Sequence, residues 1–247
     1  MRAIGQSGRV DAVVQAATRL IESLAPPAHS SVPIRVPLEI DECRWFQWAV
    51  ERDVVRFREC PGDCFRVKKW GASGPDHFDT PSGAPRHLFS KPVGEDAWLN
   101  REYVPHIAAF AYAIVEGGYD PARCSFSRYR KFARDLIVKR LGVGYETDAE
   151  FYDGVGRIYL QIEAKASTKQ TASLAAAIEQ HGLLTDLPTS AVKEIEYVLD
   201  LAPQYLWIVG PGSIDPPTHV YAVEPRGPLN AVFTPRPGLP QPPEPRP

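Results

Sequence analysis

Residues 145–165 constrain the fold of this chain most strongly, because polar and apolar residues alternate there on both sides of a turn. The Asp-Gly pair within 153–156 is typical of a tight connection between two strands. We therefore expect a hairpin of strands at 145–152 and 157–165. On the second strand, alternation puts Ile158, Leu160, Ile162 and Ala164 on an apolar face, and Tyr159, Gln161, Glu163 and Lys165 on the opposite face.

The flanking segments predict an α/β (α+β) chain with a mixed central sheet flanked by helices. After the hairpin, we expect helices over 168–181 and 189–200 and strands over 204–210 and 218–224. Before it, helices are expected over 9–25, 43–50, 96–117 and 125–141, with Pro105 kinking or splitting the third. We expect three regions: an α+β extension (1–119), a core (120–228) and a disordered tail (229–247), since seven of the last thirteen residues are proline.

Bulk composition restricts the class of protein only weakly. The chain has 247 residues and a net charge of −2, so any attraction to nucleic acid must come from local clusters. No apolar stretch approaches the roughly 20 residues that cross a bilayer, and the first residues lack a signal-peptide core, so we expect a cytoplasmic protein with reduced cysteines. Cys60 and Cys64 flank a Pro-Gly turn without a second matching pair, and we expect no structural zinc.

The polar face of the hairpin concentrates acidic residues. A two-residue turn within 153–156 makes the numbers of opposed residues add to an odd number, so Glu163 is opposed by Glu146 or Asp148. Glu150 falls on the same face. Because like charges so close together repel, the arrangement makes physical sense around a divalent cation such as Mg²⁺. A lysine beside that ion, here Lys165, can orient water or offset charge on a phosphate.

This arrangement resembles the PD-(D/E)xK nuclease superfamily, whose core runs helix, three strands, helix and strand. In that family an acidic residue on one strand faces an acidic-x-Lys tripeptide on the next. Asp148 and Glu163-Ala164-Lys165 match this pattern, and the resemblance covers roughly two fifths of the chain, over residues 125–224. It implies a restriction-endonuclease-like core that hydrolyses phosphodiester bonds in DNA with Mg²⁺ or Mn²⁺. Asp148 and Glu163 would hold the metal, and Lys165 would position water or stabilise the transition state.

Further residues are candidates for accessory roles. No proline precedes Asp148, unlike in many members of the family, and Asp153 has a suitable spacing but fits a turn better. In the family the helix before the strands often supplies a glutamate, and in the expected helix over 125–141 only an aspartate is present. The accessory candidates are Glu146, Glu150, Asp153, Gln170 and Asp135.

The expected helix over 125–141 is rich in basic residues. Such a run could follow a phosphate backbone, with a binding affinity that depends on salt, or it could be a solvated helix face. The nucleic-acid-binding candidates are Arg128, Arg130, Lys131 and Arg134.

Three alternatives stay open from the sequence. The hairpin could be a surface feature with a solvated charged face. The chain could be a catalytically inactive module of nuclease fold that binds nucleic acid or protein. The Pro-rich tail could be a ligand for aromatic grooves of a partner. Restriction, repair and mobile-element defence are all compatible roles, as is a homodimer that cuts both strands of a duplex.

Overall fold

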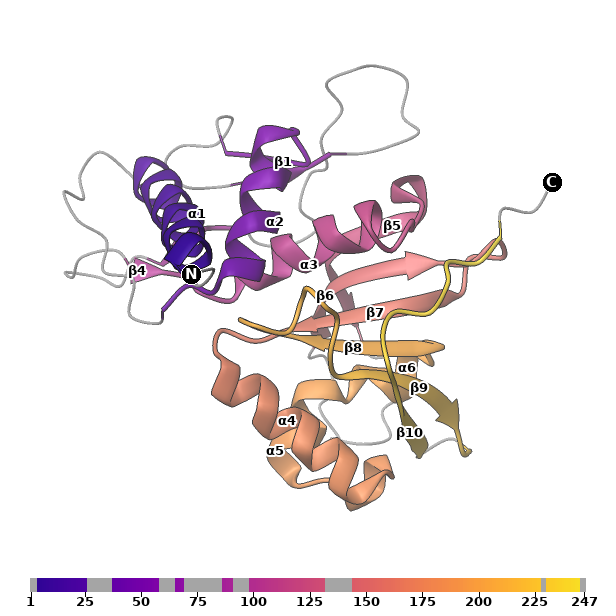
Figure 1. The fold of residues 1–247 in the computed structure, drawn as a ribbon. Coiled ribbons are helices and arrows are strands. Elements are labelled where there is room, and N and C mark those ends of the chain that lie inside the picture. Colours follow the sequence, from indigo (N-terminus) through magenta and orange to yellow (C-terminus); the bar gives the residue numbers. More distant parts are fainter. Residues whose placement is uncertain are drawn as a thin grey trace.

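A six-stranded mixed sheet forms the centre of the molecule, in the order β10-β9-β8-β7-β6-β5 (Figure 1). In the computed structural model the described parts of the chain are residues 4–25, 37–57, 65–68, 86–90, 98–131, 144–227 and 230–244. The strands are β5 (Cys124–Lys131), β6 (Gly144–Tyr152), β7 (Ile158–Ala164), β8 (Tyr205–Val209), β9 (Val220–Pro225) and β10 (Ala231–Arg236). Neighbouring strands run antiparallel except β7 and β8, which are parallel.

Helices cover both faces of the sheet, which confirms the predicted α/β class with a mixed sheet flanked by helices (Figure 1). One face carries α2 (Ile40–Glu51) and α3 (Tyr103–Val115), with α1 (Ile4–Ser23) packed against α2. The other face carries α4 (Thr168–His181), α5 (Thr189–Ile195) and α6 (Tyr197–Leu201). Two short strand pairs complete these elements, β1 (Val55–Arg56) with β2 (Arg66–Val67), and β3 (Phe89–Ser90) with β4 (Trp98–Leu99).

From Ala149 to Phe151 of the β6–β7 hairpin, the numbers of opposed residues add to an odd number, as predicted. The turn that produces this register differs from the predicted two-residue turn. Ala149 is paired with Ile162, whereas Tyr152 is paired with Ile158, so β7 carries one extra residue at Tyr159. The connection is a three-residue loop over 154–156, closed by the hydrogen bond from Asp153 N–H to the Arg157 carbonyl oxygen. The bulge offsets this odd loop length, and register in the rest of the hairpin is the one that a two-residue turn would give.

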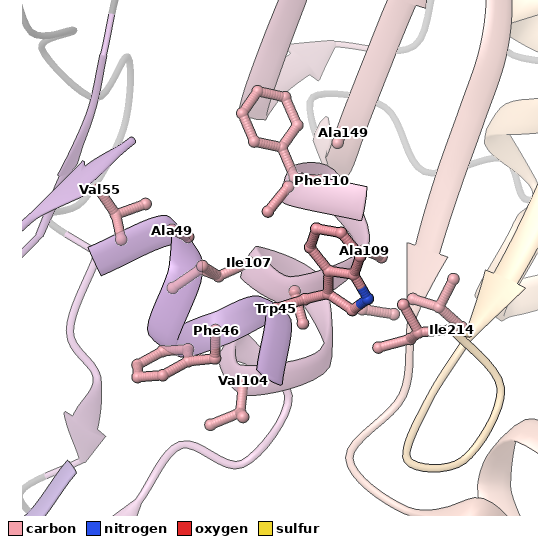
Figure 2. Close-up of a cluster of buried hydrophobic side chains, with 14 of the residues drawn as sticks. Trp45, Phe46, Ala49, Val55, Val104, Ile107, Ala109, Phe110, Ala149 and Ile214 are labelled. Atoms are coloured by element: carbon pink, nitrogen blue, oxygen red, sulfur yellow. The ribbon is translucent and has the colours of Figure 1, made fainter. Parts of the chain in front are cut away.

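Helix α3 is apolar on all sides because it lies between α2 and the sheet. Nine of its thirteen residues are buried. Figure 2 shows Trp45 and Phe46 of α2 packed with Val104, Ile107 and Ala109 of α3. The kink predicted within 96–117 does not occur, because the helix begins at residue 103 and its proline falls in the first turn, where no intrahelical N–H is needed.

The helix predicted over 125–141 is wrong for its described part. Residues 124–131 form strand β5, in which Phe126 is paired with Ala149 and Arg128 with Thr147. Phe126 is buried, and its ring stacks on His106 with 3.8 Å between centroids. Pairing with β6 and burial of this ring therefore override a residue spacing that is also typical of a helix.

The chain's C-terminal segment differs from the disordered tail predicted from residue 229. Residues 231–236 form β10, an edge strand in which Pro235 is opposite Tyr221. A proline is tolerated there because the outer side of an edge strand needs no N–H donor. Residues 237–244 then run from β10 back across the sheet toward the β6–β7 hairpin (Figure 1).

Two buried groups at the start of α2 connect this helix to other parts of the molecule. The Arg101 guanidinium donates to both carboxylate oxygens of Glu42, with 2.6 Å from Nη1 to Oε2, and to the Pro37 carbonyl oxygen at 3.0 Å. The Asp41 carboxylate accepts hydrogen bonds from the N–H groups of Gly212 (3.0 Å) and Ile214 (2.8 Å), which lie beyond β8. These contacts fix the start of α3 relative to the sheet.

Candidate functional site

A pocket of about 340 Å³ lies beside the end of β7, between the start of α3 and helices α5 and α6. Five carboxyl groups and two ammonium groups line it. The lining residues are Asn100, Glu102, Tyr103, His106, Asp148, Glu163, Lys165, Lys193, Glu194, Glu196 and Tyr197.

The three predicted catalytic residues all line this pocket. Because Ala149 is paired with Ile162, one step along the two strands sets Asp148 beside Glu163. The Asp148 carboxylate is oriented by the Ala164 N–H, which donates to its Oδ2 at 2.5 Å. The Lys165 ammonium donates to Glu163 Oε1 at 2.8 Å and also to the Glu194 carboxylate of α5. The charged face of the hairpin is therefore buried under α5 and α6 rather than solvated.

Burial and crowding change the protonation of these groups. Burial raises the pKa of Glu163 to about 8, with Lys165 opposing the rise and the charge of Asp148 adding to it. Burial disfavours the charged form of Lys165, but Glu163 and Glu194 outweigh this and raise its pKa above the usual value. Lys165 is therefore an ammonium ion, whereas burial favours the neutral form of Glu163.

Sequence reasoning missed the pocket residues at the start of α3, among them Glu102 and His106. Glu102 stands at the N-cap of the helix, and burial raises its pKa to about 7, with Lys165 lowering it and Glu163 raising it. His106 is one turn further, and its Nδ1 lies 3.7 Å from Asp148 Oδ1. Burial lowers the pKa of His106 to about 3, so the ring is neutral.

The pocket also has contributions from the helices between β7 and β8. Glu194 and Lys193 belong to α5, and Tyr197 begins α6. Burial raises the pKa of Tyr197 well above its usual value, with the charge of Glu163 adding to the shift, so its hydroxyl stays protonated. Nothing in the sequence marks these residues, because only the crossover between two parallel strands brings them to the end of β7.

The described accessory candidates lie outside the pocket lining. Glu150 is fully buried and accepts hydrogen bonds from the hydroxyls of Ser125 and Tyr152. Asp153 Oδ1 accepts from the N–H groups of Val155 and Arg157, so it stabilises the hairpin loop, as turn chemistry predicted. Gln170 is exposed in the first turn of α4, and its N–H donates to the capping Ser167.

Several candidates fall outside the described residues. Arg134 and Asp135 do so entirely, as do Cys60 and Cys64. For four others only the main chain is described, in β5 or β6, and these are Arg128, Arg130, Lys131 and Glu146.

The donor set of the pocket fits a hard divalent cation. The charge of Asp148 adds to the burial that raises the pKa of Glu163. Mg²⁺ commonly takes one or two protein carboxylates and fills its other positions with water and phosphate. Within the described part of the chain, no group of three or more His, Cys, Asp or Glu side chains is arranged to hold a metal ion. Cys43 is buried in the core and Cys124 donates to the Pro121 carbonyl oxygen, so neither described cysteine takes part in the pocket.

No family model, curated protein or solved structure matches this chain. None of the described helices is both long and apolar enough to cross a membrane.

Proposed function

We propose that this chain is a metal-dependent nuclease of the PD-(D/E)xK type that hydrolyses phosphodiester bonds in DNA. One observation carries the proposal: Asp148, Glu163 and Lys165 come from paired strands and line one pocket in which carboxyl groups outnumber ammonium groups. A solvated surface hairpin would not bury an acidic residue and a lysine, each 8% exposed, in the same cavity.

The order of elements supports the same proposal. Helix α3, strands β5, β6 and β7, helix α4 and strand β8 occur in the order helix, three strands, helix and strand, with the short helices α5 and α6 between α4 and β8. This is the order of the superfamily's core, with α3 in the place that sequence reasoning gave to residues 125–141. Glu102 then takes the position of the helix glutamate that many members carry, and it lines the pocket with Asp148 and Glu163.

Asp148 and Glu163 are the residues that would hold Mg²⁺ or Mn²⁺, with Glu102 beside them. When bound, such an ion supplies charge that stabilises the phosphate and lowers the pKa of a water molecule. The Ala164 N–H holds the Asp148 carboxylate in place, and the neutral His106 ring shields it on the α3 side. Burial raises the cost of ionising Glu163, the charge of Asp148 adds to it, and a cation would relieve this cost.

Lys165 is the group that would act on the phosphate or the attacking water. Its ammonium is held between Glu163 and Glu194, and the Glu194 side chain is half exposed. A phosphate oxygen that approaches from the open side can take the place of the Glu194 carboxylate. Lys165 would then stabilise charge that develops on the phosphate, a contribution of roughly 10²–10³ in rate for one well-placed donor.

A cleavage assay tests this proposal. We expect wild-type protein to cut plasmid and linear DNA with Mg²⁺ or Mn²⁺ and not with chelator. The Glu163→Gln variant should cut about 100-fold more slowly, because it loses a metal ligand. Glu224→Gln is the matched control, since this exposed carboxylate on β9 pairs with Arg226 away from the pocket. Cutting that persists in chelator or in Glu163→Gln would assign the activity to another site.

A second candidate is a module of the same fold that binds nucleic acid or protein without chemistry. It is favoured by the double ion pair of Lys165 with Glu163 and Glu194, which occupies the ammonium, and by the lack of a three-ligand metal group among the described residues. This candidate predicts DNA binding without cutting under every metal condition.

A further inference from the structure

Three tyrosines outside the pocket form a separate aromatic group. Tyr119 follows α3, Tyr159 lies at the bulge of β7, and Tyr205 begins β8. The ring centroids of Tyr119 and Tyr159 are 6.3 Å apart, and those of Tyr159 and Tyr205 are 5.1 Å apart. None of these residues belongs to the proposed nuclease site.

The chain's own C-terminal segment, residues 237–244, is hydrogen-bonded to two members of this group, Tyr119 and Tyr159. The buried Tyr119 hydroxyl donates to the Pro240 carbonyl oxygen at 2.9 Å, and the Tyr159 hydroxyl donates to the Gln241 carbonyl oxygen at 2.7 Å. Pro240 is buried, and Leu239 packs against the core. The pairing of β10 with β9 ends at Arg236, so this segment is held by tyrosines and packing and not by a strand ladder.

These contacts have the chemistry by which aromatic grooves read proline-rich segments. Proline fixes φ and removes an N–H, so a proline-rich chain presents carbonyl acceptors on a preformed backbone and loses little entropy on binding. Tyrosines supply flat apolar faces together with hydroxyl donors that match these acceptors. Residues 237–240 read Pro-Gly-Leu-Pro, which has the P-x-x-P spacing.

We propose that Tyr119, Tyr159 and Tyr205 form a recognition groove for proline-rich segments, which the chain fills with its own residues 237–244. The tail is then a tethered ligand of this groove. A short tether gives an effective concentration in the millimolar range, so the filled groove excludes weaker ligands until its own segment is weakened. The proposal does not depend on nuclease activity.

The test uses the full chain with the tail weakened by Leu239→Ser, Pro240→Ser and Pro242→Ser. A fluorescent peptide of residues 235–247 is titrated and binding is followed by anisotropy. We expect this variant to bind the peptide at least about tenfold more tightly than wild type does, because the competing segment is lost. A peptide with serine in place of every proline should not bind.

The tyrosine hydroxyls provide the specific control. Adding Tyr119→Phe or Tyr159→Phe to the weakened chain should reduce peptide affinity about three- to tenfold, as expected for one lost hydrogen bond. Tyr221→Phe also removes a hydroxyl that donates a hydrogen bond, to Glu179, but it lies outside the groove and should leave peptide affinity unchanged.

Two results would overturn the proposal. One is a weakened chain that keeps wild-type circular dichroism and cooperative melting yet binds no peptide. The other is equal binding of the proline-free peptide. If the weakened chain does not fold, the unaltered protein labelled with 3-fluorotyrosine decides: millimolar peptide should shift the fluorine signals of Tyr119 and Tyr159, and unmoved signals contradict the proposal.

Discussion

At the scale of single residues, the acidic residue and lysine of the tripeptide could be predicted because strand alternation fixes which side chains share a face. Glu163 and Lys165 are two positions apart on or next to β7, and Asp148 follows from the parity of the hairpin. Glu102 and Glu194 could not be predicted, because they reach Lys165 only through packing of distant segments. Local pattern therefore identified the strand residues of the pocket, and tertiary structure added the helix residues.

The lowered pKa of His106 permits a test of whether water is excluded from the pocket around its ring. Its pKa is lowered to about 3 from an ordinary value of 6.5, so folding favours the neutral ring. Its contribution to stability is fully present above about pH 6.5 and is lost as the pH falls toward 3. Between pH 7 and 4.5 wild type should therefore lose about 2–3 kcal/mol more unfolding free energy than His106→Phe, at roughly 1.4 kcal/mol per pH unit.

Urea unfolding at the two pH values measures this difference. Phe110→Leu is the matched control, because it disturbs another ring packed on Phe126 without removing a titrating group. It should shift the unfolding free energy by the same amount at both pH values. An equal pH dependence in wild type and His106→Phe would show that the His106 ring is hydrated and not buried beside Asp148.

At the scale of elements, strong periodicity gave reliable predictions and ambiguous periodicity did not. Helix α4 has the predicted bounds 168–181, because Ser167 caps its start and Gly182, at φ 71°, ends it. Strand β5 was missed because its pairing with β6 is a long-range feature that basic residues at mixed spacing do not reveal. Strand β10 was missed because its one proline, Pro235, suits an edge strand as well as a disordered chain.

The buried pair of Glu42 and Arg101 connects the start of α2 to the residue that precedes Glu102. Glu42→Ala should lower the unfolding free energy by about 3–5 kcal/mol, because it leaves the Arg101 guanidinium buried without its carboxylate. Chemical denaturation measures the change. Glu51→Ala, at the exposed end of the same helix, should change it by less than about 0.5 kcal/mol.

A double variant distinguishes the effect of the buried charges from the effect of lost packing. Glu42→Leu combined with Arg101→Met removes both charges and keeps apolar volume, so it should recover most of the loss. A cost below about 1 kcal/mol for Glu42→Ala would mean that the guanidinium finds water or another acceptor. The Glu42–Arg101 pair would then not hold the start of α3 in place.

At the scale of the whole molecule, α2 and α3 share one core with β6, β7 and β8, so residues on both sides of position 119 pack together. Sequence patterns predicted the mixed sheet and its flanking helices but not this shared core, because an apolar helix such as α3 does not show which surface it covers. The pocket exists only where α3, the hairpin and the α5–α6 crossover meet. The proposed nuclease site therefore depends on the packing of all three parts of the fold.

The most direct test of that proposal is a paired measurement on Lys165→Ala, with single-turnover DNA cleavage in Mg²⁺ and DNA affinity with Ca²⁺ in its place. Arg226→Ala, which removes an exposed cation from its pair with Glu224, is the control. The account predicts a cleavage rate lower by about 10²–10³-fold with affinity within about threefold of wild type. Cleavage at the wild-type rate, or equal losses of cleavage and binding, would contradict it.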